Sequence, residues 1–228
     1  MHLQTPLLPL TCLLTLASAH FELNQPTSRG PSHDNAGTFP CAGLPVSQER
    51  TKVPLDDPKL SIGMKMGHDH AAVQVLLALG SEPGENFNIT LVPTLGQRGL
   101  GDFCLPDVQL GEDVLGIEPK EGLEATVQVV TNGDPMGGLY NCADIVFTAS
   151  ATSPPPDSCK NGTGVTARPF PPEQASRNAN ESTANGGAQS GSGGHGGHGG
   201  HGEGAAVPLQ AAGWGAFGAA VLGAIALL

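Results

Sequence analysis

Residues 124–147 read EATVQVVTNGDPMGGLYNCADIVF and contain the clearest strand pattern in the chain. Apolar residues alternate with smaller or polar ones from Ala125 to Val129, and a similar face recurs from Leu139 to Phe147. A period of two is typical of half-buried β-strands. The intervening NGDP at residues 132–135 is typical of a turn. The two runs are therefore expected to pair as a hairpin with a longer loop.

The same alternation occurs upstream, at Val73, Val75, Leu77 and Leu79. Proline and glycine are frequent between the runs, and no convincing long amphipathic helix is present in the pattern. Short strands separated in this way favour an all-β fold, an antiparallel β-sandwich. One such domain fits residues 20–152, which is near the usual size of a single domain.

The first 19 residues resemble a secretory signal, although His2 is the only basic residue before their apolar part. The run Leu7–Leu16 is followed by Ala17-Ser18-Ala19, which fits the small-residue cleavage pattern. A membrane helix at this place would need a longer run without a proline. We expect cleavage after Ala19, which would make His20 the first residue of an exported protein.

The composition changes after Thr152. Residues 153–204 are rich in Pro, Asn, Ser and Gly, so we expect a disordered linker. Residues 205–228 have the pattern of a GPI-anchor signal that is removed on lipid attachment, with Ser190–Gly202 as the attachment region. The alternative is a C-terminal membrane helix. The expected location is the outer face of the plasma membrane, with the cell wall as an alternative.

A glycine-spaced histidine repeat lies inside this linker, at His195, His198 and His201. Such a repeat can gather around a metal only weakly, because ordering a glycine-rich chain costs entropy. We interpret it first as a spacer, and as a copper shuttle in the alternative. Attachment of the anchor before His195 would remove it.

Four cysteines remain once Cys12 leaves with the signal, and in an oxidising compartment they predict two disulfides. Sequence alone leaves three pairings open. We favour Cys41–Cys142, which would pin the N-terminal loop, and Cys104–Cys159, which would tie the start of the linker to the domain.

The sequons and the net charge limit which modifications and partners can be expected. Sequons for N-glycosylation begin at Asn88, Asn161 and Asn180, and the two in the linker are expected to be the more accessible. The net charge of −11 argues against a nucleic-acid partner, which would require basic patches.

A histidine created as the first residue has unusual power as a metal ligand. The α-amino group and Nδ1 of His20 can chelate one ion, and Cu(II) favours such square-planar nitrogen sites. A second imidazole would complete a three-nitrogen histidine brace. The sequence leaves His33, His68 and His70 as its sources within the domain. Met64 and Met66 share the strand parity of His68 and His70, and we interpret them as core or rim residues rather than thioether ligands.

Asp144 stands in the middle of a strand-like apolar run. A carboxylate buried there would need a cation or a hydrogen-bond partner, which makes it a candidate third copper ligand. The alternative is that this face of the strand is solvated.

Six short motifs occur in an order that resembles the fungal copper acquisition factors, which are GPI-anchored relatives of lytic polysaccharide monooxygenases. They are HFELNQPTSRG (20–30), PCAG (40–43), the histidine before Ala71, FCLP (103–106), ATVQ (125–128) and LYNCAD (139–144). The resemblance implies an immunoglobulin-like sandwich that holds copper through two histidines and an aspartate. Carried over to this chain, the ligands are His20, His70 and Asp144, with His68 as the alternative second histidine.

The expected function is therefore a cell-surface protein that binds one copper ion through a histidine brace and takes part in copper acquisition or homeostasis. Its candidate partner is a plasma-membrane copper transporter. The rivals are a copper-dependent polysaccharide monooxygenase and a metal-free surface spacer. Exposed aromatics that could dock a glycan are scarce, since Trp214 lies in the removable tail and Tyr140 is the sole tyrosine. We accordingly expect no enzymatic activity.

Overall fold

The computed structural model describes residues 20–31, 33–133, 136–152 and 159–190, which belong to one compact unit. Along the chain its elements are β1 (Phe21–Gln25), β2 (Thr51–Pro54), β3 (Lys59–Met66), β4 (His70–Leu79), β5 (Ile89–Arg98), β6 (Gly101–Gln109), α1 (Glu112–Leu115), β7 (Glu124–Asn132), β8 (Gly138–Thr148), β9 (Thr166–Pro169), α2 (Pro172–Ala175) and the 3-10 turn η1 (Ala179–Glu181).

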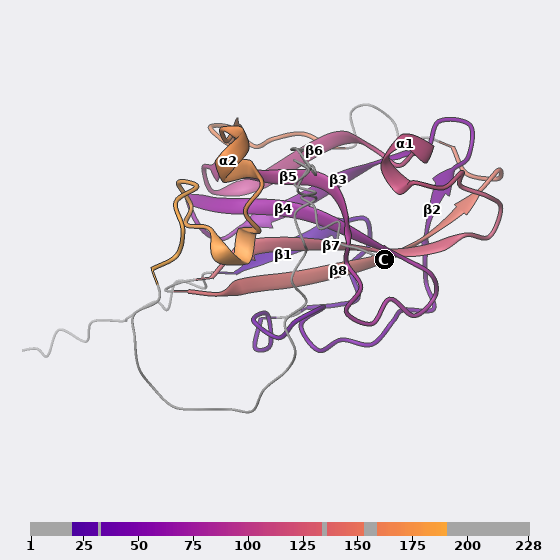
Figure 1. Cartoon of the computed structure of the whole chain (residues 1–228), viewed down its shortest axis with the longest axis horizontal. Coiled ribbons are helices and arrows are strands. Elements are labelled where there is room, and N and C mark those ends of the chain that lie inside the picture. Colours follow the sequence, from indigo (N-terminus) through magenta and orange to yellow (C-terminus); the bar gives the residue numbers. More distant parts are fainter. Residues whose placement is uncertain (1–19, 32, 134–135, 153–158, 191–228) are drawn as a thin grey trace, which may run out of the picture. The chain divides into compact units, whose positions relative to one another are not determined.

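The strands form two sheets (Figure 1). One has the order β1-β3-β6 and the other the order β2-β8-β7-β4-β5-β9. The predicted hairpin is the β7–β8 pair, which runs antiparallel from Glu124 opposite Val146 to Asn132 opposite Gly138. The other described pairs are also antiparallel, except β2, which lies parallel to β8. The predicted all-β sandwich is confirmed, with one parallel edge strand added.

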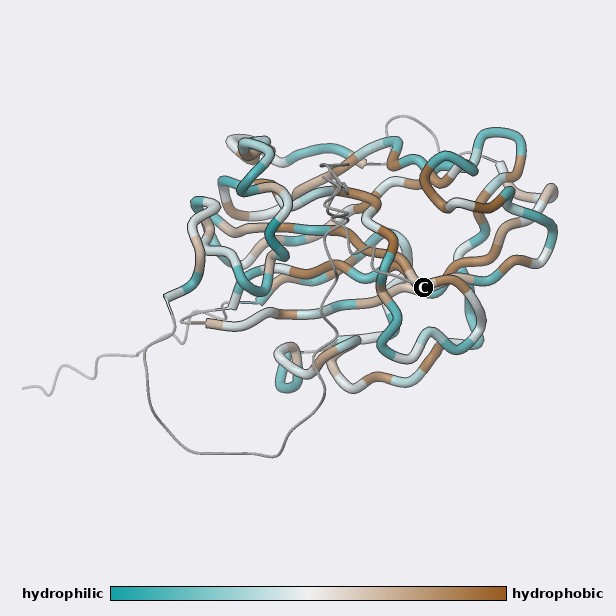
Figure 2. The backbone as a smooth tube through the Cα atoms, in the orientation of Figure 1, coloured by the Kyte–Doolittle hydropathy of each residue, from teal (hydrophilic) through white to brown (hydrophobic). Residues whose placement is uncertain are grey.

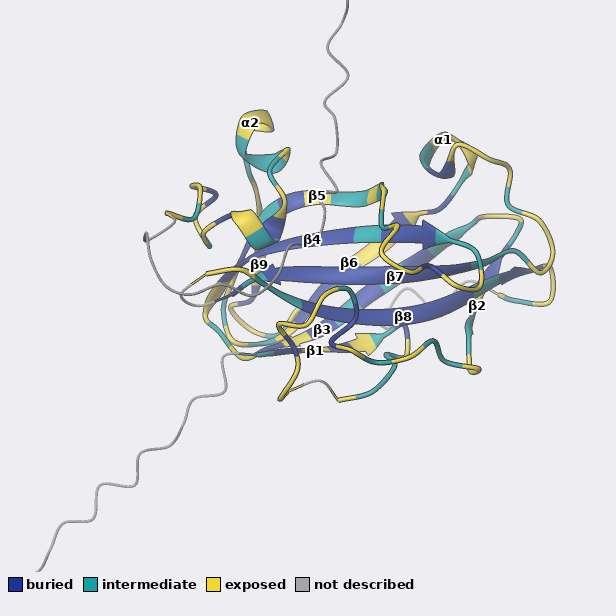
Figure 3. Cartoon of the chain, turned by 60° about the horizontal axis from the view of Figure 1, so that its bottom comes forward, coloured by how far each residue is buried: buried dark blue, intermediate teal, exposed yellow. Residues whose placement is uncertain are grey.

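The main core lies between the two sheets, where alternate strand residues meet. Val73, Val75 and Leu77 of β4 are fully buried in it, together with Ile62 of β3 and Phe103 of β6. Hydrophobic segments follow the strands while the connecting loops are mostly hydrophilic (Figure 2). Figure 3 shows β4, β7 and β8 buried along most of their length. This burial on both faces requires a cover on the outer side of the six-stranded sheet as well.

That cover is supplied by residues 166–190, here called the C-terminal arm. Phe170 and Ala179 of the arm join a second apolar cluster with Ala72, Val130 and Tyr140 of the sheet. In Figure 1 the arm, in orange, lies against one end of the six-stranded sheet.

Polar contacts hold the arm in place. Strand β9 pairs with β5, and Gln74 of β4 donates to Asn178 at 3.2 Å and accepts from the Ala179 N–H at 3.1 Å. The prediction of a disordered linker from residue 153 is therefore wrong for residues 159–190. Their few apolar side chains show no regular spacing in the sequence, but they are buried against the sheet.

Both favoured disulfides are confirmed. Cys41 pairs with Cys142, and Cys104 pairs with Cys159. The first fastens the β1–β2 connection to β8, and the second fastens the segment before the arm to β6.

The predicted signal, the histidine repeat and the anchor signal lie outside the described residues. Of the predicted attachment region, only Ser190 is described. Within the described part of the chain, no helix has the length and apolar character needed to cross a membrane.

Two of the connections at which the chain passes from one sheet to the other are adjacent, and we call them corners. Residues 67–69 connect β3 to β4, and residues 99–100 connect β5 to β6. The Gly99 N–H donates to the Asp69 carbonyl at 2.7 Å and so joins the corners. Gly99 has φ +94°, and a Cβ there would collide with the Gly164 carbonyl, so the position requires glycine. The first corner carries the histidines that the sequence singled out.

Candidate metal centre

His20 lies at the edge of a cavity of about 240 Å³. Its carbonyl accepts a hydrogen bond from the Gly67 N–H at 3.1 Å, which places the start of β1 beside the β3–β4 corner. The cavity is lined by the start of β1, by that corner with His68, Asp69 and His70, by the end of β7 and by the C-terminal arm. The structure thus brings together the predicted terminal ligand and both alternatives for the second.

His70 is held by its neighbour. Its Nδ1 lies 2.6 Å from the Asp69 carboxylate, and both side chains are about half exposed or more. An Nδ1–H that donates to a carboxylate leaves Nε2 with its lone pair available for a metal. Asp69 therefore selects the tautomer of His70 that a metal ligand needs.

His68 lines the same cavity and is partly buried. No hydrogen bond or ion pair to the His68 imidazole occurs among the described residues. His68 lacks the carboxylate that orients His70, so His70 is the better prepared ligand.

The two methionines differ in position. Both are almost fully buried in the main core, as their interpretation as core residues predicted. Met66 also lines the cavity beside His20, whereas Met64 does not.

His33 approaches His20 from another side. The two rings make an edge-to-face contact with their centroids 5.9 Å apart. The Nε2 of His33 lies 3.1 Å from the Glu22 carboxylate, and His33 is absent from the lining of the cavity that contains His70. It remains a rival second ligand because of its contact with His20.

A metal beside His20 would find the His20 imidazole and a second one from His68 or His70, and its third nitrogen would be the amine of a processed His20. In the described part of the chain, no group of three or more His, Cys, Asp or Glu side chains is arranged to hold a metal. A brace does not need such a group, since its third ligand is the terminal amine. With His20 as the first residue, the donor set at this cavity would fit Cu(II), which favours nitrogen ligands.

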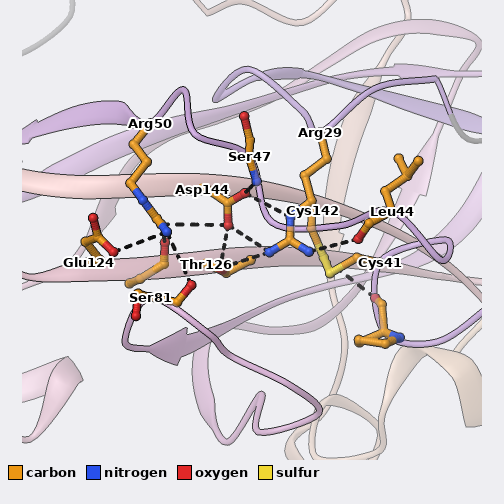
Figure 4. A network of polar contacts seen from close by, with 12 residues as sticks. Arg29, Cys41, Leu44, Ser47, Arg50, Ser81, Glu124, Thr126, Cys142 and Asp144 are labelled. Atoms are coloured by element: carbon orange, nitrogen blue, oxygen red, sulfur yellow. Dashed lines mark hydrogen bonds and ion pairs between the residues drawn. A yellow bond between two sulfur atoms is a disulfide. The ribbon is translucent and has the colours of Figure 1, made fainter.

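Asp144 lies elsewhere, in the middle of β8, and its side chain is 0% exposed (Figure 4). One oxygen accepts from Nη2 of Arg29 at 2.8 Å and from the Thr126 hydroxyl at 2.6 Å. The other accepts from Nε of Arg29 at 2.9 Å and from the Ser47 N–H at 2.7 Å. Arg50 lies 3.9 Å away and also pairs with Glu124 at 3.2 Å. The carboxylate thus receives four hydrogen bonds, which is its full capacity.

The charge of Asp144 is maintained by these partners. Burial by itself would raise the pKa of this carboxyl, but the hydrogen bonds from Arg29, Thr126 and Ser47 outweigh it and hold the pKa below its ordinary value. The cation that Asp144 requires is therefore an arginine.

The histidine cavity is distant from this carboxylate. Thr126 faces Asp144 in the β7–β8 register, while Asn132, which lines the cavity, faces Gly138. The six positions between Gly138 and Asp144 correspond to about 20 Å of strand. Asp144 is not placed to ligate a metal beside His20, and the sequence-based assignment does not fit the geometry.

Sequence reasoning missed several residues at the cavity. Asp69 is adjacent to His70, and its role could have been inferred from that spacing. No local sequence pattern marks Thr131, Asn132 or Gln189 as cavity residues. The register of β7 and the position of the arm bring them there. Asp134, predicted as a turn residue, lies outside the described residues and directly follows Gly133, which lines the cavity.

The three sequons differ in their surroundings. Asn88 is exposed before β5, as is Asn161 of the predicted linker, so exposure does not separate these two sites. The Asn161 side chain accepts from the Cys104 N–H at 2.7 Å. Asn180 is partly buried and hydrogen-bonds to Tyr140, whose pKa burial raises despite this bond. Glycosylation at the three sites stays a prediction.

Known proteins resemble this chain over most of its length. A family model described as copper acquisition factor BIM1-like matches residues 18–164. An uncharacterized protein of Aspergillus fumigatus is 51% identical over 93% of this chain and 95% of its own length. A lytic polysaccharide monooxygenase-like protein X325 of Yarrowia lipolytica is 33% identical over 72% of this chain and 62% of its own length. Copper acquisition factor BIM1 of Cryptococcus neoformans var. grubii is 29% identical over 66% of this chain and 71% of its own length.

Proposed function

This chain belongs to the family of BIM1-like copper acquisition factors, and from that premise we propose that it binds one copper ion at the cell surface. The proposed ligands are the amine and Nδ1 of His20 and the Nε2 of His70. The observation that carries this assignment is the cavity shared by the two histidines, where Asp69 already holds the other ring nitrogen of His70.

The proposed role is copper acquisition rather than catalysis. The protein would be exported, attached to the outer face of the plasma membrane by a GPI anchor, and would pass copper to a plasma-membrane transporter. Cu(II) prefers nitrogen ligands, and two half-exposed or partly buried imidazoles at an open cavity can take up and release it.

Copper titration tests the proposal. A protein that begins at His20 should bind one copper ion, as measured by calorimetry at neutral pH. The matched variant carries one additional glycine before His20, which displaces the amine while leaving every side chain in place. Its affinity should fall by about a hundredfold or more, since a chelating nitrogen is lost. Equal affinities would exclude the brace.

A polysaccharide monooxygenase is the second candidate, because relatives carry names that liken them to such enzymes. The sole tyrosine, Tyr140, is 8% exposed, and Phe39 is the one exposed large aromatic among the described residues. A flat glycan-docking surface is therefore not built from aromatics here. Because Asp144 is held by Arg29 and not by a metal, it would leave the coordination positions of a copper ion in the cavity open to oxygen, so an activity assay is needed.

The matching experiment is incubation of the copper-loaded protein with cellulose, xylan and chitin and a reductant. We expect no oxidised oligosaccharides. Copper-dependent oxidised products would assign the protein to the monooxygenases.

A further inference from the structure

The C-terminal arm provides one wall of the histidine cavity. Thr183, Ala184 and Gln189 line it together with His20 and His70. The family match ends at residue 164, so this wall lies beyond the part of the chain that the match covers.

The Gln189 side chain joins the arm to the β7–β8 hairpin. Its carbonyl oxygen accepts from the Gly137 N–H at 2.6 Å, and its amide donates to the Gly137 carbonyl at 3.0 Å. The same amide donates to the Ser182 carbonyl at 2.9 Å within the arm. One glutamine therefore satisfies both backbone groups of a hairpin residue and fixes its own segment at the same time.

Gly137 in turn hydrogen-bonds to the hairpin residue that lies next to the cavity. Its carbonyl also accepts from the Gly133 N–H at 2.8 Å, and Gly133 and Asn132 line the cavity. Asn132 reaches across to the start of β4, where its side chain accepts from the Ala72 N–H at 2.7 Å. The chain of contacts runs from Gln189 through the hairpin to the strand that begins with His70.

The arm is itself fixed by buried residues and hydrogen bonds, so Gln189 has a defined position. Ser182 and Ala179 are fully buried, and the Gln189 N–H donates to the Glu181 carbonyl at 2.8 Å. Arg177 donates to the Gly186 carbonyl at 2.7 Å, which closes the loop that presents Gln189.

We infer that the C-terminal arm is a built part of the metal cavity and that Gln189 is the positioning residue that holds the β7–β8 hairpin against it. The inference rests on the proposed function for the identity of the metal. Gln189 does not touch the ion. It fixes the part of the cavity wall formed by the hairpin and the arm, and so limits the arrangements that a bound copper can adopt.

The test replaces Gln189 with methionine, which keeps the length of the side chain and removes its three hydrogen bonds. The matched control is Gln109→Met, on β6 in the other sheet, where the exposed glutamine amide donates to the Asp107 carbonyl at 2.9 Å. Both variants are compared with the protein that begins at His20, in the presence and absence of copper.

Two readouts separate the inference from the proposed function. Hydrogen exchange at the Gly133 and Gly137 amides should accelerate at least about tenfold in Gln189→Met and stay unchanged in Gln109→Met, with or without copper. The Cu(II) paramagnetic resonance spectrum of Gln189→Met should broaden, because the cavity wall is no longer fixed. Its copper affinity should fall by about tenfold at most, the low end of the loss seen when a direct partner of a metal ligand is removed.

Gln189→Glu covers the case in which the methionine variant fails to fold. It keeps the acceptor for the Gly137 N–H, so exchange at Gly137 should remain slow while exchange at Gly133 accelerates. Unchanged exchange at both glycines in Gln189→Met would overturn the inference, as would an unaltered copper spectrum. Absence of copper binding by the unmodified protein would instead overturn the proposed function, and the exchange measurement would still decide the role of Gln189 in the hairpin.

Discussion

The histidine cavity and the Asp144 network differ in how they treat polar side chains of the same sandwich: one leaves them accessible and the other saturates them with hydrogen bonds. At the cavity, His70 has one nitrogen held by Asp69 and the other left for a ligand, and the imidazole is about half exposed. At the network, the Asp144 carboxylate is inaccessible and all its acceptor positions are used. A metal ligand must keep a lone pair and an open approach, and only the cavity offers both.

The largest expected effect is a loss of stability when the buried Asp144 network is disrupted. Asp144→Asn leaves Arg29, whose side chain is 4% exposed, as an uncompensated buried charge. The free energy of unfolding should fall by about 3–5 kcal/mol. Denaturant unfolding measures this, with the exposed Glu118→Gln as a control that removes a charge without burial. A loss as small as that of the control would show that the network does not hold the β1–β2 connection.

The next effect concerns the three histidines around His20. His70→Ala should weaken copper binding about a hundredfold, and His68→Ala and His33→Ala by less than about threefold. Among the described residues, His68 has no carboxylate partner like Asp69, and His33 does not line the cavity. Competition titration with a chelator measures all three. A larger loss in His68→Ala or His33→Ala would transfer the ligand role to that residue.

Asp69→Asn tests the orientation of His70 alone. The carboxylate that accepts from Nδ1 is replaced by an amide, while the imidazole stays. Copper affinity should fall about tenfold, as is common for an outer-shell partner of a ligating histidine. Asp57→Asn, at another exposed aspartate that forms an ion pair, is the control and should bind copper normally.

The smallest effect is the acid dependence of stability. The pKa of Asp144 is lower in the folded protein than its ordinary value, so its contribution is complete at neutral pH and is lost as the pH falls through the folded pKa. Between pH 7 and pH 3 the unmodified protein should lose more unfolding free energy than Asp144→Asn. Parallel pH profiles of the two proteins would contradict this account of the network.

Much of the fold followed from local pattern. The period of two in residues 124–147 predicted the β7–β8 hairpin, and the expectation of export, with an even number of cysteines, predicted the two disulfides. The C-terminal arm escaped prediction because its anchors, Phe170 and Ala179, are single apolar residues in a polar segment. Their burial depends on a complementary sheet surface, which no local periodicity encodes.

The candidate site was predictable only in part. His20 and His70 could be proposed as ligands because a cleavage pattern and the spacing of residues are local features of the sequence. Asp144 was correctly expected to need a cation, but an apolar strand with one carboxylate looks the same whether that cation is copper or an arginine. Its partner, Arg29, lies 115 positions away, and only the folded chain reveals the pair.

The most direct test of the central claim is the Cu(II) paramagnetic resonance spectrum of three proteins that begin at His20: the unmodified protein, Asp144→Asn and His70→Ala. Spectra are recorded at neutral pH and low temperature, after circular dichroism has shown that each protein is folded. If copper occupies the histidine cavity, the Asp144→Asn spectrum superimposes on that of the unmodified protein, and His70→Ala loses the coupling of one imidazole nitrogen. A changed spectrum in Asp144→Asn together with an unchanged one in His70→Ala would contradict the claim.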